Sequence, residues 1–493
     1  MGAHAFITTQ DRLFIAGLSV AYLILSMSLL LSWPLLWPDE AIFADTARNV
    51  LLSGHPSTTL IAGMESGAYW QPPVWFYCMA PVIGIFGYDI LPLRLVSMLV
   101  GLFILWATFL LARLLDLSTW ATRTGLVLLA LNPNFVTYVK LARMDGLCVL
   151  LTLLGLIAYA SFCVKGKIMH LAGGSVLFGL AVLTHPLGVI GPFTAGCHAL
   201  IDSRRTAKPG VRTLLWFIVP VVVAAAIWFL SSGNHAGFWT QLRFQLGRKS
   251  RPFPAPLISF LERYRSLPLF GLLVPAGLLS VWRRVHRSPS SLPLLLALGA
   301  TISTVAVAFT FETPYHIYCL PLLSIACAGF LESCRSDHSR VRRVAVAGMI
   351  AVLCNFAAYF LFFNYEFHSA LRQETDYGAF AAKIAEEIPH GATVCITGYP
   401  CPYWGMIGLE RGYRLLDETF LSDSLGIDVL SRAGWFVLVN GLSPDDDAPD
   451  VVQQIDMMRR YAVKAGKTCI LREFIGERKR FAYTARVFQL LHE

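Results

Sequence analysis

Long apolar stretches separated by short polar segments fill the first three quarters of the chain. A helix that crosses a bilayer needs about 20 mostly apolar residues, and eleven stretches come close to this length. They lie near residues 13–36, 90–115, 119–139, 145–164, 168–184, 186–202, 212–231, 266–283, 291–311, 314–331 and 342–363. The pattern predicts a mostly α-helical, polytopic membrane protein, with about eleven transmembrane helices in a module over residues 1–364.

The composition supports this class and narrows the function. Of the 493 residues, 14% are charged and 56% are hydrophobic, whereas a soluble protein carries roughly 25% charged residues. The net charge of +9 does not indicate nucleic-acid binding, because basic cytoplasmic loops give a membrane protein the same excess. The eleven cysteines show no zinc-ligand spacing, so the sequence nominates no metal ligands and leaves a divalent cofactor undecided.

The basic residues predict the orientation. When the N-terminus is placed in the cytoplasm, the inner loops hold many arginines and lysines, whereas the outer turns near residues 185 and 312 hold none. Cytoplasmic loops of membrane proteins typically carry an excess of lysine and arginine. An odd number of spans then places residues 365–493 outside the membrane, and a bacterial inner membrane suits this multi-pass arrangement.

Ionisable residues gather at the outer ends of the predicted spans. They come from separate outer connections and comprise Asp39, Glu40, Asp45, Arg48, Glu65, Lys140, Arg143, Asp145, His185, Glu312 and His316. Charged groups near membrane depth are costly and mark functional sites by default. We therefore expect a single polar cavity that faces outward.

The first outer loop, residues 37–89, begins with the sequence WPDEAIFADTAR. Pro38 suits the first position of a helix, and Asp39 and Glu40 then lie in the first turn, where the helix dipole favours carboxylates. The two acids are therefore either helix-start residues or chemical groups of a site. The predicted helix is amphipathic and ends at Gly54, and the aromatic segment YWQPPVWFY predicts a second helix in the membrane interface.

The second outer loop, residues 232–265, carries Arg243, Arg248, Lys249 and Arg251 on the side of the membrane where basic residues are uncommon. Two interpretations stay open for this cluster. It contacts the headgroups of membrane lipids, or it clamps an anionic substrate such as a phosphate.

Residues 365–493 have a different character, because charge rises and strands alternate with helices. The pattern predicts strands at 392–398, 434–441, 467–475 and 485–491, and helices at 375–388 and 449–465. We expect a small extracytoplasmic α/β domain. In an oxidising compartment Cys395 is able to pair with Cys401 or Cys469, but the sequence does not decide the connectivity.

Several motifs in a fixed order resemble one class of membrane enzymes. They are WPDE at the start of the first outer loop, LLSGH at the end of its helix, YWQPPVWFY, PLRLVSMLVGLF, KLARMDGLCVLL, LAVLTHPLGVIGPF and PYHIYCLP. Over residues 13–331 the chain resembles the GT-C class of glycosyltransferases. Within that class it is most similar to the branch of protein O-mannosyltransferases and lipid A aminoarabinose transferases.

The resemblance implies a bundle of transmembrane helices that takes a polyprenyl-phosphate sugar from the outer leaflet and transfers it with inversion. It nominates Asp39 as the catalytic carboxylate, with Glu40 beside it. Arg143 and Asp145 match an Arg-x-Asp motif of the family. The Tyr-rich turn before the tenth span is matched by Tyr315, His316 and Tyr318.

Two departures from the family concern the substrate pocket. The aminoarabinose transferases have Glu-Lys before the paired prolines, where this chain has Trp70 and Gln71. The family's usual Lys in the LTH segment is replaced by His185. The donor sugar and any metal therefore stay open.

Glycosyl transfer from a lipid phosphate has three chemical requirements. The acceptor hydroxyl must lose a proton to a carboxylate or histidine, and Asp39 is the first candidate. The departing phosphate needs cations or hydrogen-bond donors. The candidates for that role are Arg143, Lys140, His185, His316 and the Arg243–Arg251 cluster. An aromatic and polar wall for the sugar is expected from Tyr69, Trp70, Tyr315 and Tyr318. Gln71 and Asp145 are further candidates for substrate binding.

Structural interpretations stay open for the same residues. Arg143 and Asp145 also suit an ion pair between loops, and His185 suits a helix cap. The leading hypothesis is an enzyme that moves a sugar from a polyprenyl-phosphate donor to a lipopolysaccharide or other envelope glycan, a lipid or a protein. The alternative is a membrane transporter or lipid flippase, but the charges gather on one face and no repeated half is found.

Overall fold

The computed structural model describes most of the chain. It covers residues 8–28, 30–31, 33–34, 37–58, 64, 66–69, 71–206, 210–249, 258, 261, 264–265, 267–288, 290–310, 313–336, 339–363, 377–398, 411, 414–417, 427, 430–441, 449–475 and 483–492. The chain forms two compact units. The first contains Met1–Ser28, Trp70–Trp75 and Leu95–Asn364, and the second contains Leu29–Tyr69, Phe76–Arg94 and Tyr365–Glu493. The predicted division into residues 1–364 and 365–493 stays a prediction.

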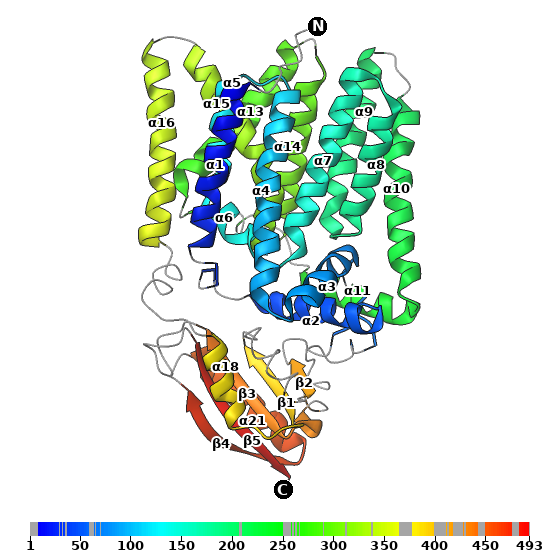
Figure 1. The fold of residues 1–493 in the computed structure, drawn as a ribbon, viewed down its shortest axis with the longest axis vertical. Helices are drawn as coiled ribbons and strands as arrows, with labels where there is room; N and C mark the ends of the chain where they lie inside the picture. Colours follow the sequence, from blue (N-terminus) through cyan, green and yellow to red (C-terminus); the bar gives the residue numbers. More distant parts are fainter. Residues whose placement is uncertain are drawn as a thin grey trace. The chain divides into compact units, whose positions relative to one another are not determined.

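Helices build the first unit. Those described are α1 (Thr9–Met27), α4 (Ile90–Leu114, from Leu95 on), α5 (Thr119–Ala130), α6 (Pro133–Val139), α7 (Met144–Lys165), α8 (Ile168–Val182), α9 (Ile190–Thr206), α10 (Gly210–Ser231), α11 (His235–Lys249), α13 (Pro268–Arg287), α14 (Leu292–Ala308), α15 (Leu320–Ser336) and α16 (Ser339–Ala358). Short helical turns form at η1 (Pro186–Val189), η2 (Thr313–Tyr318) and η3 (Tyr359–Phe363). Figure 1 shows α7, α8, α9 and α10 running alongside one another, and these helices pack in neighbouring pairs.

Five of the described helices are long and apolar enough to cross a membrane. They are Thr9–Met27, Ile90–Leu114, Met144–Lys165, Thr213–Ser231 and Ala345–Phe362, and shorter apolar helices include Ile168–Val182, Leu292–Ala308 and Leu320–Cys334. The prediction of a mostly helical, polytopic membrane protein is confirmed. Every predicted span contains a helix, while the number of eleven crossings stays a prediction.

Three predicted spans are less regular than the apolar pattern indicates. The stretch 119–139 is broken into α5 and α6, because the side chain of Asn132 accepts hydrogen bonds from the backbone N–H groups of Asn134 (3.0 Å) and Phe135 (3.3 Å). Such a cap starts a new helix, and Pro133 at its first position fits it. The stretches 186–202 and 314–331 begin as η1 and η2 before the α-helices start. These irregular segments carry most of the polar residues considered below.

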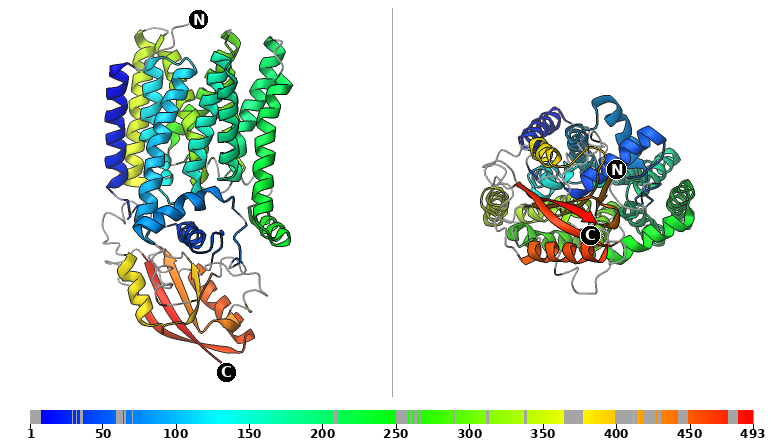
Figure 2. Two further views of the ribbon diagram at one scale, coloured as in Figure 1. Left: turned by 45° about the vertical axis from the view of Figure 1, so that its right-hand side comes forward. Right: turned by 90° about the horizontal axis from the view of Figure 1, so that it is seen from below.

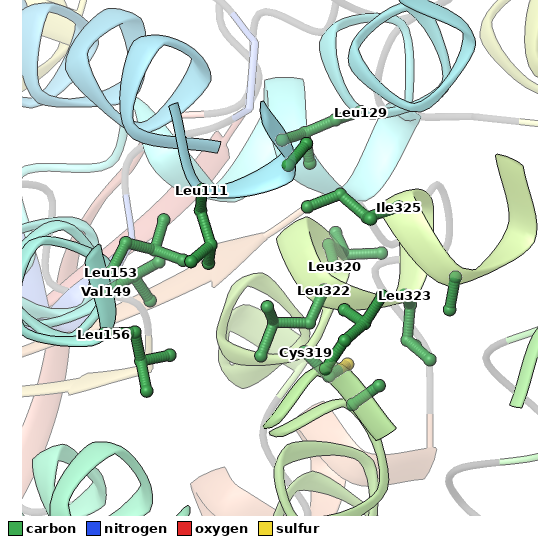
Figure 3. Close-up of a cluster of buried hydrophobic side chains, with 14 of the residues drawn as sticks. Leu111, Leu129, Val149, Leu153, Leu156, Cys319, Leu320, Leu322, Leu323 and Ile325 are labelled. Atoms are coloured by element: carbon green, nitrogen blue, oxygen red, sulfur yellow. The ribbon is translucent and has the colours of Figure 1, made fainter. Parts of the chain in front are cut away.

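The core of the first unit is packed closely between helices distant in sequence. Figure 3 shows Leu111, Leu129, Val149, Leu323 and Ile325 from α4, α5, α7 and α15 in one buried cluster. Small residues let the backbones approach, as is typical of membrane helices. A Cβ added at Gly277 on α13 would lie 2.9 Å from the backbone nitrogen of Cys327 on α15. This contact leaves no room for any larger residue.

The outer surface of the bundle is apolar. On α10, Val219, Val222, Ile227 and Leu230 are all about half exposed or more. A surface of this kind suits contact with lipid. In Figures 1 and 2, α11 turns away from the axis of α10, and Gly233 with a φ of 62° makes the bend.

The second unit contains the helices of the first outer loop, α2 (Pro38–Ser53) and α3 (Val74–Phe86, from Phe76 on). The predicted helix ends as expected at Gly54, whose φ of 79° suits glycine. It is less amphipathic than expected, because every residue from Glu40 to Ala47 is buried. The small side chains of Ala41, Ala44 and Ala47 allow packing on all sides.

The C-terminal part of the second unit is a mixed sheet with the strand order β2-β1-β3-β5-β4. Its elements are α18 (Tyr377–Glu386), β1 (Thr393–Gly398), β2 (Arg414–Asp417), β3 (Trp435–Gly441), α21 (Pro449–Lys464), β4 (Lys467–Ile475) and β5 (Tyr483–His492). Strands β2, β1 and β3 are parallel, and β5 pairs antiparallel with β3 and β4. The predicted small α/β domain is confirmed as a mixed sheet, and the four-residue strand β2 was too short to predict.

The cysteines of this sheet are not cross-linked to each other. Cys395 lies on β1 and Cys469 on β4, and two strands lie between them in the sheet, which is too far for an S–S bond. The predicted alternative of a Cys395–Cys469 disulfide is therefore wrong. Cys401, the other predicted partner, lies outside the described residues.

Candidate active site

The acidic start of α2 is organised as the sequence predicts. Pro38 occupies the first turn and Asp39 and Glu40 follow it. The backbone N–H of Trp37 donates to Glu40 Oε2 at 2.8 Å, which closes the end of the helix. Asp39 is partly exposed, whereas Glu40 is completely buried. The two neighbouring carboxylates thus differ sharply in their surroundings.

Arg94 is the partner of Glu40, although it was not among the predicted site residues. Its Nε and Nη2 donate to the two carboxylate oxygens at 2.8 and 2.6 Å, and its Nη1 donates to the carbonyl oxygens of Leu30 (2.7 Å) and Pro34 (3.0 Å). Both charged side chains have zero exposure. An arginine inside the apolar stretch PLRLVSMLV was the available signal. These contacts favour a structural role for Glu40, whose catalytic assignment stays a prediction.

A second carboxylate of α2 is also buried. Thr58 Oγ1 donates to Asp45 Oδ2 at 2.8 Å and ties the helix to the segment that follows it. The guanidinium carbon of Arg48 lies 5.7 Å from the ring centre of Tyr88. Burial and, next, the charge of Asp45 raise the pKa of the Tyr88 hydroxyl well above its usual range, and the charge of Arg48 opposes this shift. Asp45 therefore acts first as a structural acid within the second unit.

In the first unit, several predicted residues meet at the start of α7. Arg143 precedes the helix, and its Nε donates to Asp145 Oδ2 at 2.8 Å. The hydroxyl of Tyr318 on η2 donates to the other oxygen, Asp145 Oδ1, at 3.2 Å. All three side chains are at most 6% exposed. The ion pair is thus linked to a turn more than 170 residues away in the chain.

His185 completes this cluster from the start of η1. Its Nδ1 accepts a hydrogen bond from the N–H of Leu187 at 3.1 Å, so the proton of the neutral ring is on Nε2. That Nε2 lies 3.9 Å from Asp145 Oδ1. The ring packs against Tyr315 and Tyr318, with centroid distances of 5.2 and 5.6 Å. We call Arg143, Asp145, His185, Tyr315 and Tyr318 the polar cluster.

His316 and Lys140 lie buried on neighbouring segments of the same unit. His316 Nδ1 is 3.3 Å from the side-chain nitrogen of Asn134, and its ring stacks on Tyr264 at 5.3 Å. Lys140 follows the last residue of α6 and has no exposed surface. Asn134 and Tyr264 were not among the predicted site residues. The motif NPN at a predicted span centre pointed to the first, and nothing in the loop sequence pointed to the second.

For the remaining predicted residues the structure gives only the burial of the side chain, or they lie outside the described residues. Tyr69 is partly buried in the second unit, and Gln71 is buried in the first. Trp70 is not among the described residues. Arg243 is exposed on α11. Arg248 and Lys249 belong to the same helix, but their side chains fall outside the described part of the chain.

The described residues contain no group of three or more His, Cys, Asp or Glu side chains able to hold a metal ion. The polar cluster has one carboxylate and one histidine, and the carboxylate is bonded to an arginine. Its donor set suits an anion or a sugar better than a cation.

Residues 70–228 match the model of a protein family described as dolichyl-phosphate-mannose-protein mannosyltransferase. The chain has the fold of the GT-C membrane glycosyltransferases. The matched segment includes Arg143, Asp145 and His185 of the polar cluster. The resemblance expected from the sequence motifs is confirmed. No sequence among the curated proteins matches the chain.

Solved structures of GT-C enzymes share the fold. ArnT from Cupriavidus metallidurans bound to undecaprenyl phosphate aligns with a TM-score of 0.55 at 15% identity, over 97% of this chain and 98% of that chain. Its apo state aligns with a TM-score of 0.59 at 14% identity, again over 97% of this chain and 98% of that chain. The oligosaccharyltransferase AglB from Archaeoglobus fulgidus, in complex with an inhibitory peptide and a dolichol-phosphate, gives 0.55 at 11% identity over 99% of this chain and 75% of that chain.

Proposed function

We propose that this glycosyltransferase takes a sugar from a polyprenyl-phosphate donor and transfers it with inversion to an acceptor outside the cytoplasm. The acceptor class is a lipopolysaccharide or other envelope glycan, a lipid or a protein. Two proteins with this fold were solved with undecaprenyl phosphate and with a dolichol-phosphate, which supports a lipid-phosphate donor here.

The polar cluster carries this proposal. Asp145 fixes the guanidinium of Arg143 through its Nε at 2.8 Å, so the two Nη groups of Arg143 keep one orientation. A guanidinium oriented in this way matches the oxygens of a phosphate. His185 and the tyrosines Tyr315 and Tyr318 add N–H and O–H groups and aromatic faces, which suit the sugar and its phosphate. Asp145 is therefore a positioning residue in our proposal.

Asp39 is the proposed catalytic base. An acceptor hydroxyl must lose its proton as it attacks the anomeric carbon, and Asp39 is a partly exposed carboxylate. If the acceptor nucleophile is itself a phosphate, no base is needed and Asp39 positions the substrate. We further propose that Tyr69, Trp70 and Gln71 contribute to the sugar pocket.

The basic helix α11 is proposed to serve the lipid side of the reaction. Arg243 is exposed there, and Arg248 and Lys249 follow on the same helix. They attract either lipid headgroups or the donor phosphate. The distribution of basic residues supports a bacterial inner-membrane protein with a cytoplasmic N-terminus and an extracytoplasmic active site and C-terminal domain.

The test uses the full-length protein in lipid nanodiscs with radiolabelled polyprenyl-phosphate sugars and an envelope extract as the source of acceptor. Asp39→Asn is expected to reduce transfer by about 10²–10⁴-fold, the usual contribution of a general base, and to keep donor binding. Asp116→Asn is the matched control, because Asp116 is exposed and its φ of 58° is one that asparagine accepts. Undiminished transfer by Asp39→Asn would exclude Asp39 as the base.

A further inference from the structure

One buried amide of the first unit lacks an internal partner for its carbonyl oxygen. Gln71 is 9% exposed, and within the described part of the chain its Oε1 is buried and accepts no hydrogen bond. Proteins satisfy nearly all of their buried polar atoms. The missing hydrogen-bond donor is therefore expected to come from a molecule that binds beside Gln71.

The segment that carries Gln71 is rigid. Pro72 and Pro73 fix the backbone that follows it, and a residue before proline is restricted to extended conformations. The N–H of Val74 then donates to the carbonyl oxygen of Leu183 at 3.0 Å. Leu183 is two residues before His185, so this bond holds the Gln71–Val74 segment against the connection that leads into the polar cluster.

The charges of the polar cluster limit the kind of sugar that fits there. The described carboxylates of the first unit are Asp11, Asp116, Asp145, Asp202 and Glu332. Only Asp145 belongs to the cluster, where it accepts hydrogen bonds from Arg143 and Tyr318. An ammonium group on the sugar would compete with Arg143 for this one acid. A hydroxyl both donates and accepts, as the neutral amide of Gln71 does.

We infer that Gln71 binds a hydroxyl of the transferred sugar through its Oε1, and that the first unit selects an uncharged sugar. This inference rests on the proposed function, because it names the sugar class of the same donor. Gln71 is in this assignment a specificity-determining residue that contacts substrate.

The experiment measures binding to the full-length protein in nanodiscs. The probes are undecaprenyl phosphate alone, its glucosyl, mannosyl and galactosyl derivatives, and its 4-amino-4-deoxypentosyl derivative. The variant Gln71→Met keeps the side-chain length and removes the acceptor, and Gln489→Met on β5 is the matched control. We expect at least one neutral derivative to bind the wild type more tightly than the amino derivative. Gln71→Met is expected to weaken that neutral derivative by about 3–12-fold, the usual range for one hydrogen bond, without changing the affinity for undecaprenyl phosphate.

A thermal melt without ligand separates this role from a structural one. Gln71→Met removes a buried polar atom that has no described partner, so the melting temperature is expected to stay the same or to rise. A lower melting temperature with unchanged neutral-sugar affinity overturns the inference, as does a wild type that prefers the amino derivative. In both cases binding of undecaprenyl phosphate still supports the proposed function. A wild type that binds no lipid phosphate overturns the proposed function and this inference together.

Discussion

Glu40→Ala leaves the Arg94 guanidinium buried without its carboxylate. The pair is joined at 2.8 and 2.6 Å with zero exposure on both sides. Breaking a fully buried ion pair by removing one partner typically costs about 3–5 kcal/mol. The loss of the Trp37 N–H bond to Glu40 adds a smaller cost of about 1 kcal/mol. We therefore expect a loss of about 4–6 kcal/mol of unfolding free energy.

The measurement is a double-mutant cycle with Glu40→Ala, Arg94→Met and both changes together, unfolded by SDS in mixed micelles. The double variant no longer contains an unpaired buried charge at this place, so its cost is expected to be at least about 2 kcal/mol below the sum of the single costs. Asp11 and Arg123 supply the control pair. They are joined at 2.9 Å, but the Arg123 side chain is 30% exposed, so their coupling is expected to be about 1 kcal/mol or less.

The reasoning would be refuted if the losses of unfolding free energy in Glu40→Ala and Arg94→Met added up to the loss in the double variant. A coupling energy near zero means that the two groups do not compensate each other's burial, whatever their distance. Transfer assays on the same variants add a second check. Because Glu40 holds the turn that carries Asp39, we expect Glu40→Ala to reduce transfer even at temperatures where the variant is folded.

Two further predictions concern the first unit. Tyr318→Phe removes the hydroxyl that donates to Asp145 and is expected to lower the free energy of unfolding by about 1.5–3 kcal/mol, the range for a hydrogen bond to a charged group. Initial rates of transfer should show a raised KM for the lipid donor. An unchanged KM would contradict the assigned bond. Gly277→Ala places a Cβ against the backbone of α15 and is expected to cost about 1–3 kcal/mol in SDS unfolding. Gly329→Ala, where a Cβ meets nothing within 4 Å, is its control and should be neutral or stabilising.

The sequence was informative about the polar cluster because its members share one physical property. Arg143, Asp145, His185 and Tyr318 all lie at predicted outer ends of apolar spans, where polar groups are costly. The basic loops predict the orientation of the spans, and this orientation was enough to expect the four residues at the same face of the membrane. The specific contacts were not predictable, since nothing in the sequence tells that Tyr318 donates to Asp145 or that His185 uses Nδ1 as an acceptor.

The partner of Glu40 shows a different limit. Arg94 is 54 residues away and lies four residues into α4, which the hydropathy pattern treats as one uniform span. Hydropathy averages over a single polar residue, so the span was predicted correctly while its most important side chain was missed. The break at Asn132 was lost for the same reason, because the flanking stretches are apolar enough to read as one helix.

Asp39 and Glu40 are adjacent in the chain but differ in burial, and we propose different tasks for them. Glu40 accepts three hydrogen bonds, from the Trp37 N–H and from two nitrogens of Arg94. To take a proton from a substrate it would have to give up a bond to a buried guanidinium, which then has no carboxylate. Asp39 is partly exposed at the first turn, where a substrate hydroxyl can reach it. In the proposed mechanism Glu40 therefore stabilises the turn, and Asp39 is the base.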